Sequence, residues 1–153
     1  MTMSGSAEPA SGNGFSAEER AAMRERAAEL RAEADRPRGG KAAAAELDVM
    51  AKIAAMAPAD RAVAERIHAI VTTHAPELSP KLWYGQPAYA RAGKVVCFFR
   101  SGDADKEPYS TFGFTAEASL DDDSGLWPTS YAVTELSEGA VAALTALVQR
   151  AAG

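Results

Sequence analysis

The chain contains a single cysteine, Cys97, among its 153 residues. An internal disulfide is therefore excluded, as are the zinc motifs that need several cysteines. Long apolar runs are also missing, since no stretch approaches the roughly 20 residues of a membrane-spanning helix. Residues 1–14 have neither the basic start nor the apolar run of a signal peptide. We therefore expect a soluble, cytoplasmic protein that does not interact with a membrane.

Basic residues are scarce: 16 Lys and Arg face 21 Asp and Glu, for a net charge of −5. Binding to DNA or RNA is not expected, because neutralising phosphates requires clustered basic side chains. The charge is also uneven along the chain. Residues 41–100 hold eight basic and five acidic residues, whereas residues 101–138 hold one basic and nine acidic residues. This distribution predicts an anionic patch on the later loops.

Three segments follow from composition and helix signals. Residues 1–14 are rich in Ser, Gly and Ala and predict a disordered tail. Residues 15–40 predict a charged helix and a linker, with Ser16 and Glu19 forming a capping box at the helix start. The only large apolar residues of this helix are Met23 and Leu30, a stripe too thin for deep burial. We expect a peripheral helix that mediates self-association through residues 15–35 or docks to a partner.

Residues 41–153 predict one domain that begins with helices, continues with strands and closes with a helix. Ten of the 11 aromatic residues lie within 83–131, and aromatics favour sheets. The predicted helices span 42–57, 60–74 and 137–152, and the predicted strands span 82–90, 95–100, 109–114 and 130–133. Short connections favour an antiparallel sheet of about four or more strands with helices on one face, a two-layer α+β sandwich.

The stretch from Trp83 to Tyr89 combines aromatics, a glycine, an amide and a proline. If it is one strand, Gly85 leaves a notch between the large rings of Trp83 and Tyr89, and Pro87 requires an edge position or a bulge. A notch with aromatic walls suits a small-molecule or peptide pocket. The candidate ligand contacts are Trp83, Tyr84, Gln86 and Tyr89. Alternatively, Trp83 and Tyr89 belong to the core and Gly85 marks a bulge.

Other motifs predict little chemistry. Asp121, Asp122 and Asp123 lack the glycine and glutamate that an EF-hand needs at the later positions, but three loop carboxylates can attract a hard cation weakly. Asp and Gly in this loop are equally typical of an ordinary turn. Cys97 lies within an apolar strand, which predicts a buried, inert thiol. No nucleophile, base and acid occur in a catalytic arrangement, so we expect a protein that is not an enzyme.

The chain resembles the YdhG-like family, a domain of unknown function, over roughly residues 44–151. The resemblance is carried by these residues: Pro76-Glu77-Leu78, Trp83, Gly85, Pro87, Tyr89, Gly93-Lys94, Gly113-Phe114 and the helix from Ser137. It implies a fold similar to frataxin for residues 41–153. Some members look like intracellular iron chaperones, which bind iron through surface carboxylates and deliver it to proteins.

Two functional hypotheses follow. The first is a non-enzymatic cytoplasmic binding protein of the YdhG-like family that binds and delivers iron, held weakly by Asp121, Asp122 and Asp123 with no tightly bound cofactor. The second is a recognition module for a peptide or small molecule at the Trp-Tyr-Gly-Gln-Pro notch. In both cases the partner is an unidentified protein or small ligand.

Overall fold

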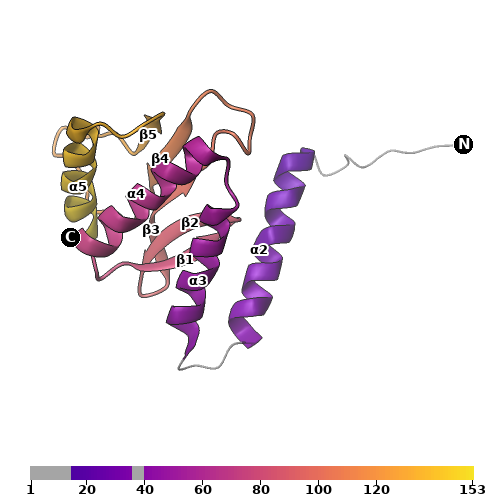
Figure 1. Ribbon diagram of the computed structural model, residues 1–153. Coiled ribbons are helices and arrows are strands. Elements are labelled where there is room, and N and C mark those ends of the chain that lie inside the picture. Colours follow the sequence, from indigo (N-terminus) through magenta and orange to yellow (C-terminus); the bar gives the residue numbers. More distant parts are fainter. Residues whose placement is uncertain (1–14, 36–39) are drawn as a thin grey trace, which may run out of the picture.

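The computed structural model describes residues 15–35 and 40–153, which form four helices and a five-stranded antiparallel sheet (Figure 1). The predicted α+β fold is therefore confirmed. The predicted disordered tail, 1–14, and residues 36–39 of the predicted linker lie outside the described residues. The helices are α2 (Ala17–Asp35), α3 (Lys41–Ala54), α4 (Pro58–His74) and α5 (Glu138–Ala152). The strands are β1 (Ser79–Trp83), β2 (Gln86–Arg91), β3 (Lys94–Arg100), β4 (Ser110–Phe114) and β5 (Ser130–Val133).

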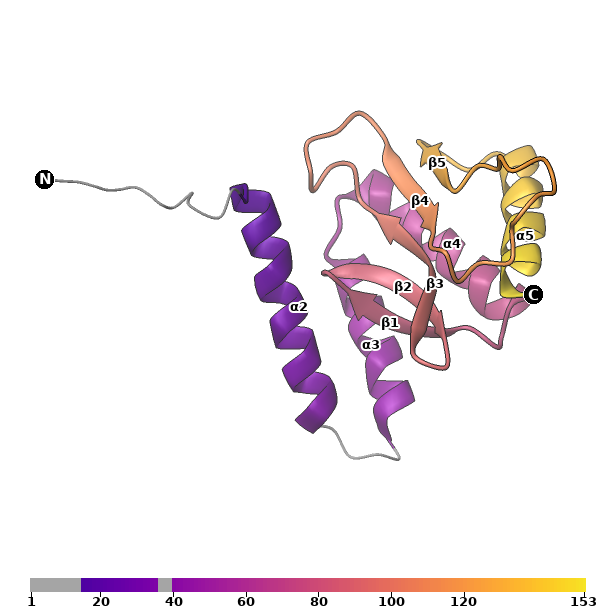
Figure 2. The same cartoon turned by 180° about the vertical axis from the view of Figure 1, so that it is seen from behind.

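The sheet is a meander in which each strand pairs with the next one along the chain. Antiparallel neighbours need only short turns, and the β2–β3 turn is the two residues Ala92 and Gly93, both with positive φ. Helices α3, α4 and α5 lie on one face of this sheet, and α2 stands beside α3 (Figures 1 and 2). Within the described residues, no helix is long and apolar enough to cross a membrane.

Three helix starts carry local sequence signals, although α3 ends at Ala54 rather than at the predicted residue 57 and α4 begins at Pro58 rather than at residue 60. At α2, the Glu19 amide donates to Ser16 Oγ at 3.0 Å and the Ser16 amide donates to Glu19 Oε1 at 2.8 Å, which confirms the capping box. Pro58 occupies the first turn of α4, where its missing amide hydrogen has no helical partner to lose. Ser137 caps α5 by accepting from the Ala140 amide at 3.2 Å.

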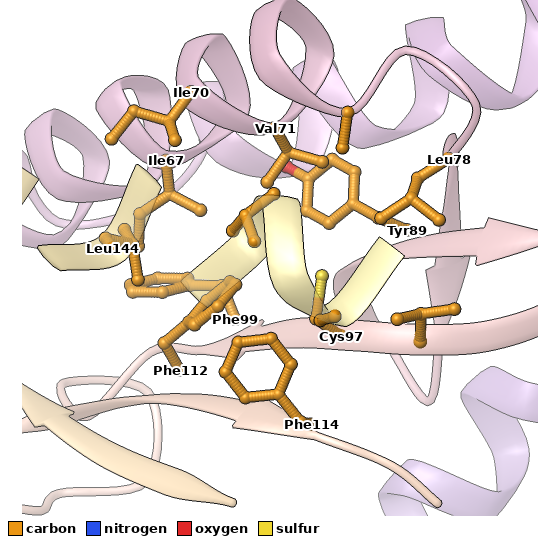
Figure 3. Packing of buried hydrophobic residues seen from close by; sticks show 14 of the residues in the cluster. Ile67, Ile70, Val71, Leu78, Tyr89, Cys97, Phe99, Phe112, Phe114 and Leu144 are labelled. Carbon is orange, nitrogen blue, oxygen red and sulfur yellow. The ribbon is translucent and has the colours of Figure 1, made fainter. Parts of the chain in front are cut away.

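The hydrophobic core lies between the sheet and helices α3, α4 and α5. Figure 3 shows Ile67 and Val71 of α4 above the aromatic side chains of Phe99 and Phe112. Its largest fully buried side chains are Tyr89, Phe99, Phe112, Ile67, Leu78, Val49, Val71, Val96, Val148 and Cys97. None of the buried residues in this core belongs to α2. The domain from residue 41 onward therefore contains its own core.

Candidate functional site

The stretch from Trp83 to Tyr89 is a β-hairpin rather than one strand. Trp83 and Gln86 are cross-strand partners, and Tyr84 and Gly85 form the turn between β1 and β2 with φ values of 55° and 76°. Two consecutive positive φ values are typical of a type I′ turn, which matches the twist of the paired strands. The prediction of a continuous strand at 82–90 is wrong. The predicted notch between the rings of Trp83 and Tyr89 does not form, because Gly85 lies at the turn and the space beside it is occupied by the Glu25 carboxylate.

Pro87 is accommodated in a different way from the one predicted. Strand β2 lies between β1 and β3, so Pro87 is not in an edge strand. Its partner on β1 is Leu82, and pairing with β3 begins only at Ala88. The register shift in this strand lies between Tyr89 and Ala90, two residues further on. Pro87 thus occupies the end of the β2–β3 ladder, where no backbone donor is required of it.

A groove of about 730 Å³ lies between the N-terminal half of α2 and the hairpin tip. The α3–α4 connection, the end of β3 and the loop after β3 complete its lining. Three of the four predicted ligand contacts, Trp83, Tyr84 and Gln86, line this groove. The structure therefore brings these three side chains together beside one solvent-accessible space.

The aromatic wall of the groove is a chain of ring contacts. Trp83 meets Tyr84 edge to face, with ring centroids 5.2 Å apart, and meets Phe98 with centroids 5.4 Å apart. The Arg26 guanidinium of α2 lies 5.8 Å from the centre of the Tyr84 ring. This distance falls within the range of a cation–π interaction. The Tyr84 ring thus makes a cation–π interaction with Arg26 within the chain.

Carboxylates outnumber cations around the groove. The acidic residues in its lining are Glu18, Glu19, Glu25, Asp103 and Asp105, and the basic ones are Lys52 and Arg100. Both basic side chains are paired: Lys52 Nζ lies 3.2 Å from Glu25 Oε2, and Arg100 contacts Asp105. A concave surface lined by charge of one sign concentrates ions of the opposite sign. The groove therefore favours a positively charged ligand.

The outer wall of the groove is tied to the start of α4. Asp60 Oδ2 accepts a hydrogen bond from Ser101 Oγ at 2.5 Å and another from the Asp103 amide at 3.0 Å. These bonds hold the loop after β3 against the first turn of α4. Asp103 is thereby placed at the rim by its backbone, and the residue is exposed.

Tyr89, the fourth predicted ligand contact, lies apart from the groove. Its side chain is 0% exposed, so no atom of it is available to a ligand at the surface. Its hydroxyl lies 3.0 Å from His68 Nδ1, and His68 Nε2 lies 3.1 Å from Glu46 Oε2. Burial, followed by the nearby Cys97 and Glu46, raises the pKa of the Tyr89 hydroxyl well above its ordinary value.

The Glu46–His68–Tyr89 chain was not found by sequence reasoning. It joins α3, α4 and β2, because each of its three residues comes from a different element. A buried hydroxyl requires a hydrogen-bond partner, and His68 provides one for Tyr89. The only available signal was a histidine on the core-facing side of a helix together with an aromatic hydroxyl in an apolar strand. The sequence spacing could not show that the two would meet.

The predicted metal ligands Asp121, Asp122 and Asp123 lie on an exposed loop before β5. The Asp122 carboxylate accepts hydrogen bonds from both the hydroxyl and the amide of Ser124, at 2.5 and 3.0 Å. The hydroxyl bond, followed by the amide bond, lowers the pKa of Asp122. In residues 15–35 and 40–153, no three His, Cys, Asp or Glu side chains are placed to hold one metal ion. The iron site stays a prediction.

Comparisons of the chain with protein-family models, with curated proteins and with solved structures find no match. The YdhG-like resemblance and the cytoplasmic location therefore stay sequence predictions.

Proposed function

We propose that this chain is a binding protein whose groove between α2 and the β1–β2 hairpin holds a positively charged small molecule or peptide segment. The observation that carries the proposal is the combination of the aromatic wall with an excess of carboxylates around one groove of about 730 Å³. Ligand sites commonly pair apolar or aromatic walls with a few polar groups that fix orientation. Trp83, Tyr84 and Gln86 provide these two kinds of group here.

The chemistry of the wall favours an amine or a guanidinium. A cation above an aromatic ring is stabilised by about 0.5–1 kcal/mol at exposed sites and by more when it is desolvated. Arg26 makes such a contact with Tyr84 inside the chain. Asp103 at the rim would add charge attraction to an incoming cation, and the side-chain amide of Gln86 would orient a polar ligand.

Binding is proposed in preference to catalysis. Among the residues that the structure describes, the two strongly raised pKa values belong to Tyr89 and Cys97, both of which are buried in the core. Strongly perturbed groups mark catalytic sites when they lie in a cleft that a substrate can enter. Neither residue lines the groove, so their perturbation reflects packing.

The test is a fluorescence titration in a Trp127→Phe background, which leaves Trp83 as the only tryptophan. Short peptides of lysine or arginine are titrated against glutamate peptides of equal length. We expect the basic peptides to change the Trp83 emission in a saturable way and the acidic peptides to leave it unchanged. Equal responses to both kinds of peptide, or no response to either, would contradict the proposal.

An Asp103→Asn substitution supplies the matched charge control. It removes one rim carboxylate, and because the Asp103 backbone amide makes the bond to Asp60, the loop should keep its position. We expect the basic peptides to bind a few-fold more weakly to this variant, since an exposed charge contributes up to about 1 kcal/mol. Asp123→Asn, on a loop outside the groove, should leave their affinity unchanged.

A further inference from the structure

Helix α2 packs against the domain through its carboxylates. Glu25, Glu29 and Glu33 are spaced four residues apart and therefore share one face of the helix. Each of the three carboxylates has its own partner on the domain. Lys52 Nζ lies 3.2 Å from Glu25 Oε2, and Lys81 Nζ lies 3.3 Å from Glu33 Oε2. Between them, Glu29 accepts hydrogen bonds from two backbone amides of the hairpin turn.

The hairpin turn binds a carboxylate with both of its free amides. The Tyr84 amide donates to Glu29 Oε1 at 3.1 Å and the Gly85 amide donates to Glu29 Oε2 at 2.8 Å. In a two-residue hairpin turn these two amides have no partner in the strand ladder. Consecutive amides that point the same way form an anion-binding concavity. Glu29 fills it with its side chain only 10% exposed.

Glycine is favoured at the second turn position for two reasons. Gly85 has a φ of 76°, in the region that disfavours side chains. A Cβ added there would lie 2.2 Å from Glu25 Oε2. The tip of the hairpin is therefore open enough for the carboxylates of Glu25 and Glu29 to approach its backbone together.

The large apolar residues of α2 are not buried against the domain. Met23 is 40% exposed and Leu30 is 49% exposed, and no α2 residue belongs to the buried core. A surface helix normally buries its apolar side chains and exposes its charges. The arrangement in α2 is the reverse, so charge and hydrogen bonding, rather than hydrophobic burial, hold the helix in place.

We infer that Lys52, the Tyr84–Gly85 turn and Lys81 form a docking surface for an acidic helix, and that α2 is an exchangeable occupant of this surface. Partly exposed ion pairs contribute little each and weaken with salt, so α2 can leave without disturbing the core. A helix with carboxylates at the same spacing can then take its place. This inference goes beyond the proposed ligand groove and does not depend on whether the groove binds a cation.

Exchange of α2 would also change the groove. Glu18, Glu19 and Glu25 of α2 line it, so undocking removes three of its carboxylates and one of its walls. The docking surface and the groove are thereby coupled through one helix. Occupation of the surface by another acidic helix would replace this wall with a different one.

The experiment uses the full-length chain with Glu25→Gln, Glu29→Gln and Glu33→Gln, labelled with ¹⁵N for NMR. A synthetic peptide of residues 15–35 with the natural sequence is the probe. We expect the Tyr84 and Gly85 amide signals to move and saturate on addition of the peptide. About 0.5 M NaCl should reverse the shifts, because the Debye length falls to roughly 4 Å.

Two variant peptides provide matched controls with the same net charge. A peptide with Glu29→Gln should bind at least about tenfold more weakly, because it loses the charged partner of the turn amides. A peptide with Glu18→Gln should bind like the parent, since Glu18 makes no contact with the docking surface. Circular dichroism of the triple variant checks that the chain itself is folded.

Two results would overturn the inference. One is that the triple variant is folded but its Tyr84 and Gly85 signals do not move on addition of about 1 mM natural peptide. This concentration would reveal even a dissociation constant of about 1 mM, which corresponds to a binding free energy of roughly 4 kcal/mol. The other is equal binding of the Glu29→Gln peptide and the natural peptide. Loss of basic-peptide binding in the fluorescence titration concerns the groove proposal alone.

Discussion

Cys97 is a residue whose chemistry is decided by its burial. The sequence predicted a buried thiol because Cys97 lies among apolar strand residues, and the side chain is 0% exposed in the structure. Burial raises its pKa to about 12. A thiol with such a pKa contains almost no thiolate near neutral pH, and the thiolate is the nucleophilic form.

We expect the free energy of unfolding to fall at alkaline pH because the buried Cys97 thiol resists deprotonation. Its pKa is about 12 when folded and 9.0 in the reference state, so above pH 9 the unfolded chain releases this proton first. The folded state then holds more protons, and the free energy of unfolding falls as pH rises, by about 1 kcal/mol at pH 10. Urea denaturation of the wild type and of Cys97→Ala between pH 7 and pH 10 measures the effect. The wild type should show the steeper loss, and equal slopes would refute this assignment.

Sequence reasoning left two surroundings open for Tyr89, the wall of a pocket and the hydrophobic core. Its aromatic ring in an apolar strand is compatible with both a pocket wall and a core position. The structure places it in the core, with its hydroxyl next to His68. The contact joins residues 21 positions apart, so sequence spacing alone could not reveal it.

At the level of elements, the hairpin tip was the feature most difficult to predict. Type I′ turns prefer Asn-Gly or Asp-Gly, and here the first position is Tyr84, with a φ of 55°. A tyrosine in this conformation costs of order 1 kcal/mol. Its contacts with Trp83 and Arg26 offset part of this cost. Only Gly85 signalled a turn, and the surrounding aromatics favoured a strand.

Gly85→Ala and Gly93→Ala form a matched pair of turn substitutions. Both glycines have positive φ, 76° and 83°, so each substitution should destabilise the fold by about 1 kcal/mol. An added Cβ at Gly85 meets Glu25, whereas one at Gly93 meets nothing within 4 Å. We therefore expect only Gly85→Ala to displace Glu25 and loosen α2. Hydrogen exchange of the α2 amides measures this, and equal protection in both variants would argue against the docking geometry.

The helices were more predictable than the hairpin. α2 begins and ends where its capping box and helix-forming composition indicated, and the predicted strand 130–133 coincides with β5. Both depend on local signals. Local signals could not show which residues α2 contacts, because its partners Lys81, Tyr84 and Gly85 lie about 50 residues away along the chain.

For the whole molecule, the domain should fold without the N-terminal segment. All buried core residues lie within 49–152, and α2 is held by polar contacts. Deletion of residues 1–40 should therefore retain a cooperative thermal transition and lower the free energy of unfolding by only about 1–2 kcal/mol. Circular dichroism during heating tests this prediction. A truncated chain without a cooperative transition would show that α2 is an integral part of the fold.

The sequence by itself determined the α+β class, the limits of α2, the β2–β3 turn and a buried Cys97, because periodicity, caps and turn residues act over a few neighbours. It also indicated that Trp83, Tyr84 and Gln86 were unusual. Only the tertiary structure decided that these three line one groove with α2, that Tyr89 is buried against His68, and that Glu29 binds the hairpin turn. These contacts join residues far apart in the chain, and they depend on how the helices pack against the sheet.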